Sequence, residues 1–175
     1  MDDEALAARA AAGDAAAFDA LVRAHTDLMY RVALRVCGDP TDAEDVVQEA
    51  WIAAWRALPG FRADAKVSTW LYRVVSNTAL AHLRRRKTAV SLTEVDVVDA
   101  RPTPEGQTLL QERAAAVHRA IAALEPSQRI PLVLRELEGL SYAEVAEVLG
   151  VDTTALHRRL HRARVALLAK LKELR

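Results

Sequence analysis

The segment between residues 141 and 171 constrains the fold most, because two helical patterns flank a three-residue turn. Ser141 and Glu144 have the spacing of a capping box, which predicts that a short amphipathic helix begins after Ser141. Gly-Val-Asp follows, in which Gly150 can adopt a left-handed conformation and Asp152 can cap the next helix. A short helix, a glycine-containing turn and a long helix together predict a helix-turn-helix motif.

The long helix of this motif has two faces of different chemistry. Its apolar side contains Leu156, Leu160, Ala163, Leu167 and Leu171. Its basic side contains His157, Arg158, His161 and Arg162, flanked by Arg159 and Arg164. An α-helix fits the major groove of DNA, where arginine can bond guanine edges in a bidentate manner. A solvated basic face would have the same pattern, but the preceding short helix and turn favour DNA recognition.

Metal binding and catalysis find little support in the sequence. His157 and His161 are four residues apart, as in a zinc-binding helix, but the glutamate of H-E-x-x-H is missing and the intervening arginines would repel a cation. No Ser/His/Asp order, no paired cysteines and no glycine-rich phosphate loop are present. We therefore expect no catalytic residue, no cofactor and no metal.

Two further helices are predicted before residue 60. Apolar residues recur at helical spacing between Asp14 and Cys37, and Thr41 with Glu44 has the capping-box spacing that opens the next helix. One face of that helix contains Val47, Ala50, Trp51, Ala54 and Leu58. The opposite face contains Asp45, Gln48, Glu49, Ile52 and Arg56. An apolar residue among acids is typical of a protein-docking surface, although a solvated acidic face has a similar pattern.

The third predicted helix, residues 68–87, ends in four consecutive basic residues, which the helix dipole partly explains. Its predicted core positions are Leu71, Val75, Thr78 and His82. The opposite side contains Arg73, Asn77, Leu80 and Arg84. Near its start, three aromatic residues stand close to three cations: Phe61, Trp70 and Tyr72 beside Arg62, Lys66 and Arg73. Single-stranded nucleic acid binds such surfaces, but two of the aromatics could instead be half-buried core residues.

The distribution of charged residues and one stretch without helical periodicity divide the chain into segments. Residues 1–50 carry 11 acidic and 4 basic side chains, whereas residues 51–87 carry 8 basic and 1 acidic. Residues 88–125 are again acidic and residues 126–175 again basic, which indicates two anion-binding surfaces unless each block is only a solvated face. Residues 88–105 lack helical periodicity, which predicts a linker, and Thr103 with Pro104 predicts the start of the next helix.

Composition predicts an all-α, cytoplasmic protein. Helix formers dominate the 175 residues, of which only 6 are glycine and 6 are proline. Pro131, inside a helix expected to begin at Pro126, should remove one backbone hydrogen bond or shift the helix start. The N-terminal residues predict no signal peptide, and no apolar stretch is long enough to cross a bilayer. The single cysteine, Cys37, cannot form an internal disulfide and is expected to be a small buried hydrophobe.

Two segments resemble a known family. DAEDVVQEAWIAAWRALPGFRADAKVSTWLYRVVSNTALAHLRRR, from Asp42, is similar to region 2 of the bacterial RNA polymerase sigma factors. LEPSQRIPLVLRELEGLSYAEVAEVLGVDTTALHRRLHRAR, from Leu124, is similar to their region 4. With only these two regions, the chain resembles the extracytoplasmic-function subgroup of the sigma-70 family. The resemblance implies two small helical domains on a flexible linker: 1–87 as region 2, 88–105 as linker and 106–175 as region 4.

The resemblance also implies roles for individual residues. Docking on core polymerase would involve Asp45, Gln48, Glu49, Ile52 and Arg56. Recognition of the melted −10 element would involve Phe61, Arg62, Lys66, Ser68, Thr69, Trp70, Arg73, Asn77, Arg84 and Arg85. Recognition of the −35 duplex would involve Thr153, Thr154, His157, Arg158, Arg159, His161, Arg162 and Arg164. Some positions, namely Val67, Ser76, Thr154, His157 and Arg158, depart from the residues usual in the family.

A sigma factor is the function that the resemblance implies. Its partners would be core RNA polymerase, promoter DNA and an anti-sigma factor, and it would not itself be embedded in a membrane. Bond formation would belong to the polymerase, so we expect a specificity subunit and not an enzyme. The alternative is a stand-alone helix-turn-helix regulator, which would need neither the acidic docking face nor the aromatic loop. A helical scaffold, in turn, would show no salt-dependent DNA binding.

Overall fold

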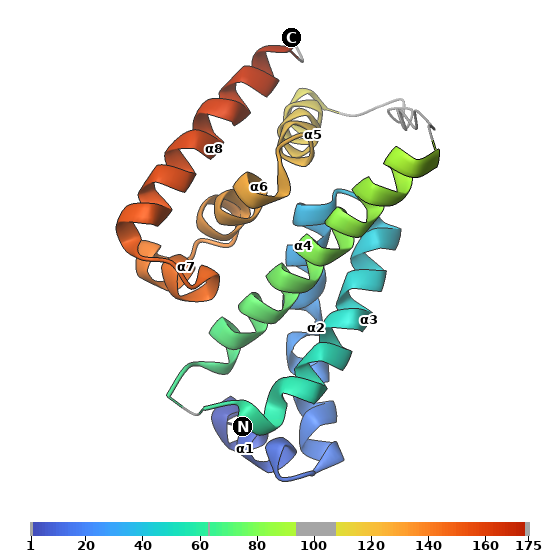
Figure 1. The fold of residues 1–175 in the computed structure, drawn as a ribbon, viewed down its shortest axis with the longest axis vertical. Helices are drawn as coiled ribbons and strands as arrows, with labels where there is room; N and C mark the ends of the chain where they lie inside the picture. Colours follow the sequence, from blue (N-terminus) through green and yellow to red (C-terminus); the bar gives the residue numbers. More distant parts are fainter. Residues whose placement is uncertain (1, 63, 94–107, 174–175) are drawn as a thin grey trace.

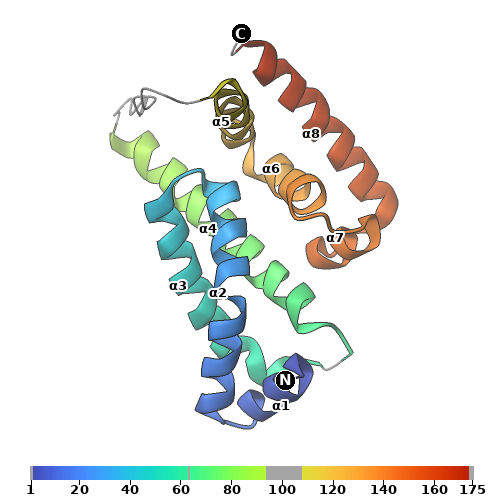
Figure 2. The same ribbon diagram turned by 180° about the vertical axis from the view of Figure 1, so that it is seen from behind.

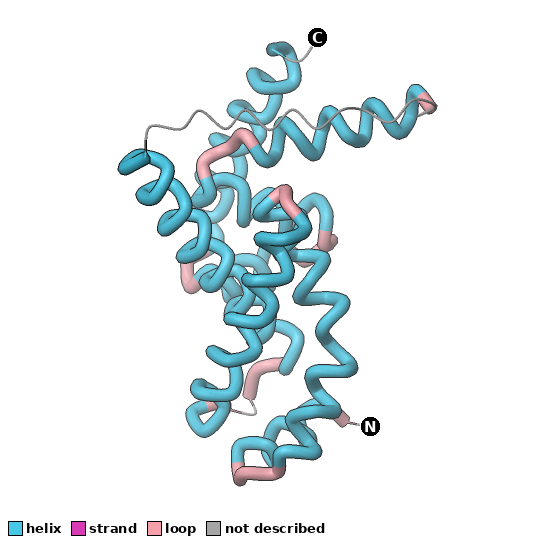
Figure 3. Tube along the Cα trace, turned by 90° about the vertical axis from the view of Figure 1, so that its right-hand side faces the viewer, coloured by secondary structure: helices cyan, strands magenta, loops and turns pink. Residues whose placement is uncertain are grey.

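The computed structural model describes residues 2–62, 64–93 and 108–173, and all regular structure in these ranges is helical (Figure 3). The first half contains α1 (Asp3–Ala11), α2 (Ala15–Cys37), α3 (Pro40–Ala57), the 3-10 turn η1 (Leu58–Gly60) and α4 (Val67–Thr93). The second half contains α5 (Leu109–Ala122), α6 (Pro126–Leu132), the π-helical turn η2 (Val133–Leu137), α7 (Tyr142–Leu149) and α8 (Thr153–Glu173). The all-α prediction is confirmed for these residues. None of these helices is long and apolar enough to cross a membrane.

Helices α2, α3 and α4 form a bundle whose lower end is covered by α1, a helix that was not predicted (Figure 1). Fully buried side chains from the three long helices meet in its core, among them Leu21, Met29, Val46 and Leu71. Cys37 is buried as expected, and burial raises the pKa of its thiol to about 11, which keeps it protonated at neutral pH. This packing fixes which faces of α3 and α4 remain exposed.

Two helix ends differ from the prediction. The Asp39 side chain accepts hydrogen bonds from the backbone N–H groups of Thr41 and Asp42, so Asp39 is the N-cap of α3 and Pro40 occupies its first turn. The predicted capping box of Thr41 with Glu44 is therefore wrong. Helix α4 continues past Lys87, because residues 88–93 contain neither glycine nor proline to stop it.

The buried side of α4 also differs in part from the prediction. Leu71 and Val75 are fully buried as predicted, but the buried line continues through Ala79, four residues on, and not through Thr78. Thr78 is only partly buried, and its hydroxyl donates to the backbone carbonyl of Val74. His82 lies at the edge of the bundle, where its Nε2 is 3.0 Å from Asp42 Oδ1 on α3.

The second half confirms the helix-turn-helix. The capping box of Ser141 and Glu144 is present in both directions and opens α7. Gly150 adopts the left-handed conformation at φ 64°, and Asp152 Oδ1 accepts from the backbone N–H of Ala155 at 2.7 Å. Helix α5 begins at a capping box of Thr108 with Gln111, whereas the predicted cap at Thr103 and Pro104 lies outside the described residues. Pro131 is buried inside α6, and the π-helical turn follows directly after that helix.

The two halves pack against each other. In both Figure 1 and Figure 2, α4 lies between the α2–α3 pair and the C-terminal helices, and residues of α4 contact α6 and α7. Arg129 is buried between the halves, where its guanidinium donates to the carbonyls of Val36 at 2.5 Å, Ala122 at 2.5 Å and Leu124 at 2.6 Å. One side chain therefore satisfies the last carbonyls of α2 and of α5 at the same time.

Candidate nucleic-acid interface and docking surface

The predicted basic face of α8 lies on the surface. Leu156, Leu160 and Ala163 are fully buried, which turns the other side of the helix outward. The exposed residues are Thr153, Thr154, His157, Arg158, Arg159, His161 and Arg162. The last five of these, together with Ala155, line a shallow depression on the surface. A row of donors on one exposed helix face is an arrangement that a DNA groove can accept.

An aromatic stack holds His157 at this face. The rings of His157 and Tyr142 are stacked with centroids 4.5 Å apart, and the Arg135 guanidinium lies 4.6 Å from the centre of the Tyr142 ring. Arg164 is only partly exposed because it donates to Glu136 Oε1 at 2.5 Å and contacts the Tyr142 hydroxyl at 3.3 Å. Arg164 first, and then Arg135, lower the pKa of Tyr142. Tyr142 was not predicted as a site residue, because its role depends on its contact with His157 across the turn, which the sequence does not show.

A cavity of about 360 Å³ lies at the start of α4, beside the aromatic residues that were predicted to bind single-stranded nucleic acid. Its lining residues include Phe61, Arg62, Thr69, Trp70 and Arg73. Phe61 and Trp70 are partly buried, with ring centroids 5.1 Å apart, and they pack against the core while they line this cavity. Lys66 is exposed and Ser68 is partly buried nearby. Tyr72 does not join this group, since its hydroxyl donates to Glu138 of the second half.

The exposed side of α4 faces the C-terminal helices. Arg73 Nη2 donates to the carbonyl of Glu147 at 2.6 Å, at the end of α7. Asn77 and Arg84 lie outside the aromatic cavity and line a second cleft, of about 390 Å³. Arg159 and Arg162 of α8 line that same cleft. The structure thus brings residues predicted for two different DNA elements to one place.

The predicted docking face is exposed on α3. Its members are Asp45, Gln48, Glu49, Ile52 and Arg56, and Ile52 is 48% exposed. Trp55 was not predicted as part of this face. It is 44% exposed and lies edge-on to Phe18, with ring centroids 4.8 Å apart. Glu49 pairs with Arg85 of α4 at 2.7 Å, which ties a predicted DNA residue to the docking face. Among the residues that the structure describes, no cluster of His, Cys, Asp and Glu could hold a metal ion.

Two family models match the chain, one in each half. The family model of sigma-70 region 2 matches residues 21–89, and that of sigma-70 region 4 matches residues 114–167. The RNA polymerase sigma-H factor of Pseudomonas aeruginosa is 38% identical over 94% of this chain and 91% of its own. The ECF RNA polymerase sigma factor SigM of Mycobacterium tuberculosis is 40% identical over 95% and 82%. The solved structure of CnrH in complex with the cytosolic domain of CnrY has 31% identity and a TM-score of 0.68 over 98% and 97%.

Proposed function

The chain belongs to the extracytoplasmic-function sigma factors of the sigma-70 family, and we propose that it directs core RNA polymerase to promoters in the cytoplasm through two DNA surfaces. We assign region 2 to α1–α4 and region 4 to α5–α8, and the matched residues 21–89 and 114–167 lie within these two sets of helices. The exposed basic face of α8, presented by a capped helix-turn-helix, is the observation that carries the proposal. The protein acts by binding, and the polymerase performs the chemistry.

The −35 element is read by α8 as duplex DNA. His157, Arg158, His161 and Arg162 point away from the buried leucines, and these are the residues that reach base edges. Thr153 and Thr154 lie at the N-terminus of the helix, where backbone N–H groups and hydroxyls favour a phosphate. Arg159 and Arg164 flank the base-reading row and contribute positive charge toward the backbone.

We expect Arg158→Ala to relax the −35 preference by about tenfold at the base that Arg158 contacts, because one good side-chain-to-base pair contributes roughly 1–3 kcal/mol of discrimination. Binding to a library of −35 duplexes measures the preference. Lys172→Ala removes an exposed cation from the last turn of the same helix and serves as the control. A uniform loss across all sequences would show that Arg158 contacts phosphate only.

We expect Tyr142→Ala to weaken preference at the base that His157 reads by about fivefold, since an aromatic pair contributes roughly 0.5–1.5 kcal/mol. Tyr142→Phe keeps the ring stack and should retain that preference. In a His157→Ala background, Tyr142→Ala should change the preference no further, because the two side chains act together. Additive effects in this cycle would show that Tyr142 supports the fold and does not position His157.

The melted −10 strand binds at the start of α4. The cavity beside Phe61 and Trp70 offers aromatic walls and cationic groups, as a single-stranded base requires. Thr69 lines this cavity, and Arg62, Lys66 and Ser68 lie around it. Further along α4, Asn77 contacts the strand, and Arg84 and Arg85 lie close to its phosphates. Stabilising the separated strand more than the duplex favours the open complex.

Protein partners bind the remaining exposed surfaces. The face of Asp45, Gln48, Glu49, Ile52 and Arg56 docks on core polymerase, and exposed Trp55 extends its apolar part. A further partner in this proposal is an anti-sigma factor, and the similar solved structure of CnrH also contains a second protein, the cytosolic domain of CnrY.

Run-off transcription with purified core polymerase on a promoter library tests the proposed function. We expect transcripts that begin at a common promoter sequence and that require the protein. Capture of core polymerase by the protein separates the sigma factor from a stand-alone helix-turn-helix regulator. Sequence-specific duplex binding without capture of the polymerase would favour the regulator.

A further inference from the structure

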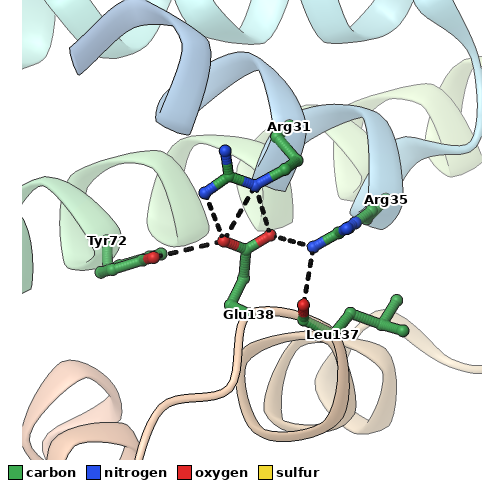
Figure 4. Close-up of polar contacts among 5 residues, drawn as sticks. All are labelled: Arg31, Arg35, Tyr72, Leu137 and Glu138. Atoms are coloured by element: carbon green, nitrogen blue, oxygen red, sulfur yellow. Dashed lines mark hydrogen bonds and ion pairs between the residues drawn. The ribbon is translucent and has the colours of Figure 1, made fainter. Parts of the chain in front are cut away.

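Glu138 connects the two halves of the chain (Figure 4). It follows η2, and its side chain is only 1% exposed. Arg31 of α2 donates to it through Nη2 at 2.8 Å and Nε at 3.1 Å, and Arg35 of α2 donates to the same carboxylate. The Tyr72 hydroxyl of α4 donates to Glu138 Oε2 at 3.2 Å. A carboxylate of the second half is therefore surrounded by donors of the first.

Electrostatics favour this arrangement only while the halves are together. A buried carboxylate is costly without partners, and two guanidiniums and a phenol provide them here. Glu138 raises the pKa of Arg31, while burial first and Glu138 second raise the pKa of Tyr72, so both of these donors keep their protons. Arg31 is 47% exposed, so water can solvate it again when the contact opens.

The contact between the two halves also involves residues that are proposed to bind DNA. Arg73 is held by the carbonyls of Glu147 and Val148, and Glu147 is one of the residues that line the aromatic cavity. Asn77 shares its cleft of about 390 Å³ with Arg162 of α8. Residues proposed for the −10 and −35 elements therefore line one cleft while the two halves are packed together.

We propose that Glu138, Arg31, Arg35 and Tyr72 form a latch through which the two halves dock on each other in cis, and that this latch opens before promoter DNA binds. The inference rests on the proposed function, since it is the promoter that the closed form excludes. In the closed form Arg73 of the first half is bonded to carbonyls of the second half, and Asn77 shares a cleft with Arg159 and Arg162. Opening releases Arg73 from the carbonyls of Glu147 and Val148 and separates Asn77 from Arg159 and Arg162.

Two variants with opposite charge changes test the latch. Glu138→Gln removes a negative charge from one side, and the double variant Arg31→Gln/Arg35→Gln removes two positive charges from the other. We expect both to increase the radius of gyration of the full chain in small-angle X-ray scattering. Both should also lower the protein concentration for half-maximal transcription with core polymerase by about tenfold, as expected for losing one hydrogen bond to a charged group.

Milder variants and controls complete the experiment. Tyr72→Phe removes one donor and keeps the ring, so it should give a smaller shift in the same direction and guards against misfolding of the other variants. Glu112→Gln changes charge at an exposed site on α5 and should behave as wild type. Circular dichroism confirms that each variant retains its helices.

Unchanged radius and unchanged titration in both latch variants would overturn the latch. A gain in Glu138→Gln with a loss in the double arginine variant would also overturn it, because charge and not opening would then explain the result. Expansion of both variants, with no promoter-directed transcription from wild type at any concentration, would support the latch and overturn the proposed function instead.

Discussion

Replacing Arg129 by methionine is expected to lower the free energy of unfolding by about 2–4 kcal/mol, because buried carbonyls lose their donor. The guanidinium donates to Val36, Ala122 and Leu124, and these carbonyls lie at the ends of α2 and α5. Methionine fills a similar volume but donates nothing. Removing the buried charge recovers part of the loss, since burial also lowers the pKa of Arg129. Urea unfolding, followed by circular dichroism, measures the change.

Replacing Arg129 by lysine tests whether its positive charge or the hydrogen-bond geometry of its guanidinium provides the stability. Arg129→Lys keeps the positive charge, but a single ammonium cannot reproduce the fork that reaches carbonyls from both halves. We therefore expect Arg129→Lys to be destabilised as well, by about 1–3 kcal/mol. Arg119→Met removes an exposed arginine of α5 and should shift stability by less than about 0.5 kcal/mol. A methionine variant as stable as wild type would mean that the cost of burying the charge cancels its hydrogen bonds.

Features that depend on neighbouring residues could be predicted from the sequence. The capping box at Ser141, the left-handed Gly150 and the buried leucines of α8 each follow from a few consecutive residues. The first turn of α3 was misassigned because Asp39 and Thr41 are both good caps, and the proline between them favours Asp39. Local chemistry thus predicts the longer helices, although α1 was missed and some helix ends and one buried face were misassigned.

Features that depend on distant residues could not be predicted. Glu138 and Arg31 are 107 residues apart, and no pattern in the sequence pairs them. Arg129 is an arginine in a helical segment, a residue that is almost never fully buried, so its role as a buried donor was not expected. Tyr142 was predicted only as part of an amphipathic helix, whereas its stack on His157 depends on the angle between α7 and α8. The packing of the two halves therefore has to come from the structure.

Asn77→Ala is expected to reduce open-complex formation by roughly hundredfold while leaving duplex −35 binding nearly unchanged, because a base edge would lose its polar partner in a desolvated site. Asn77 is exposed on α4, so its loss should not disturb the core. Permanganate footprinting of melted promoter DNA measures the open complex, and a gel-shift with a −35 duplex measures the other surface.

Thr88→Ala, about three turns further along α4, is the matched control, and it should leave both assays unchanged. Because the closed form places Asn77 in a cleft with Arg162, the test is strongest in a Glu138→Gln background, where the latch is expected to be open. There the effect of Asn77→Ala reports on DNA contact alone. An equal loss in both assays would contradict the separation of −10 and −35 recognition. Asn77 would then support the folded structure that both surfaces need, and would not act through contact with the melted strand.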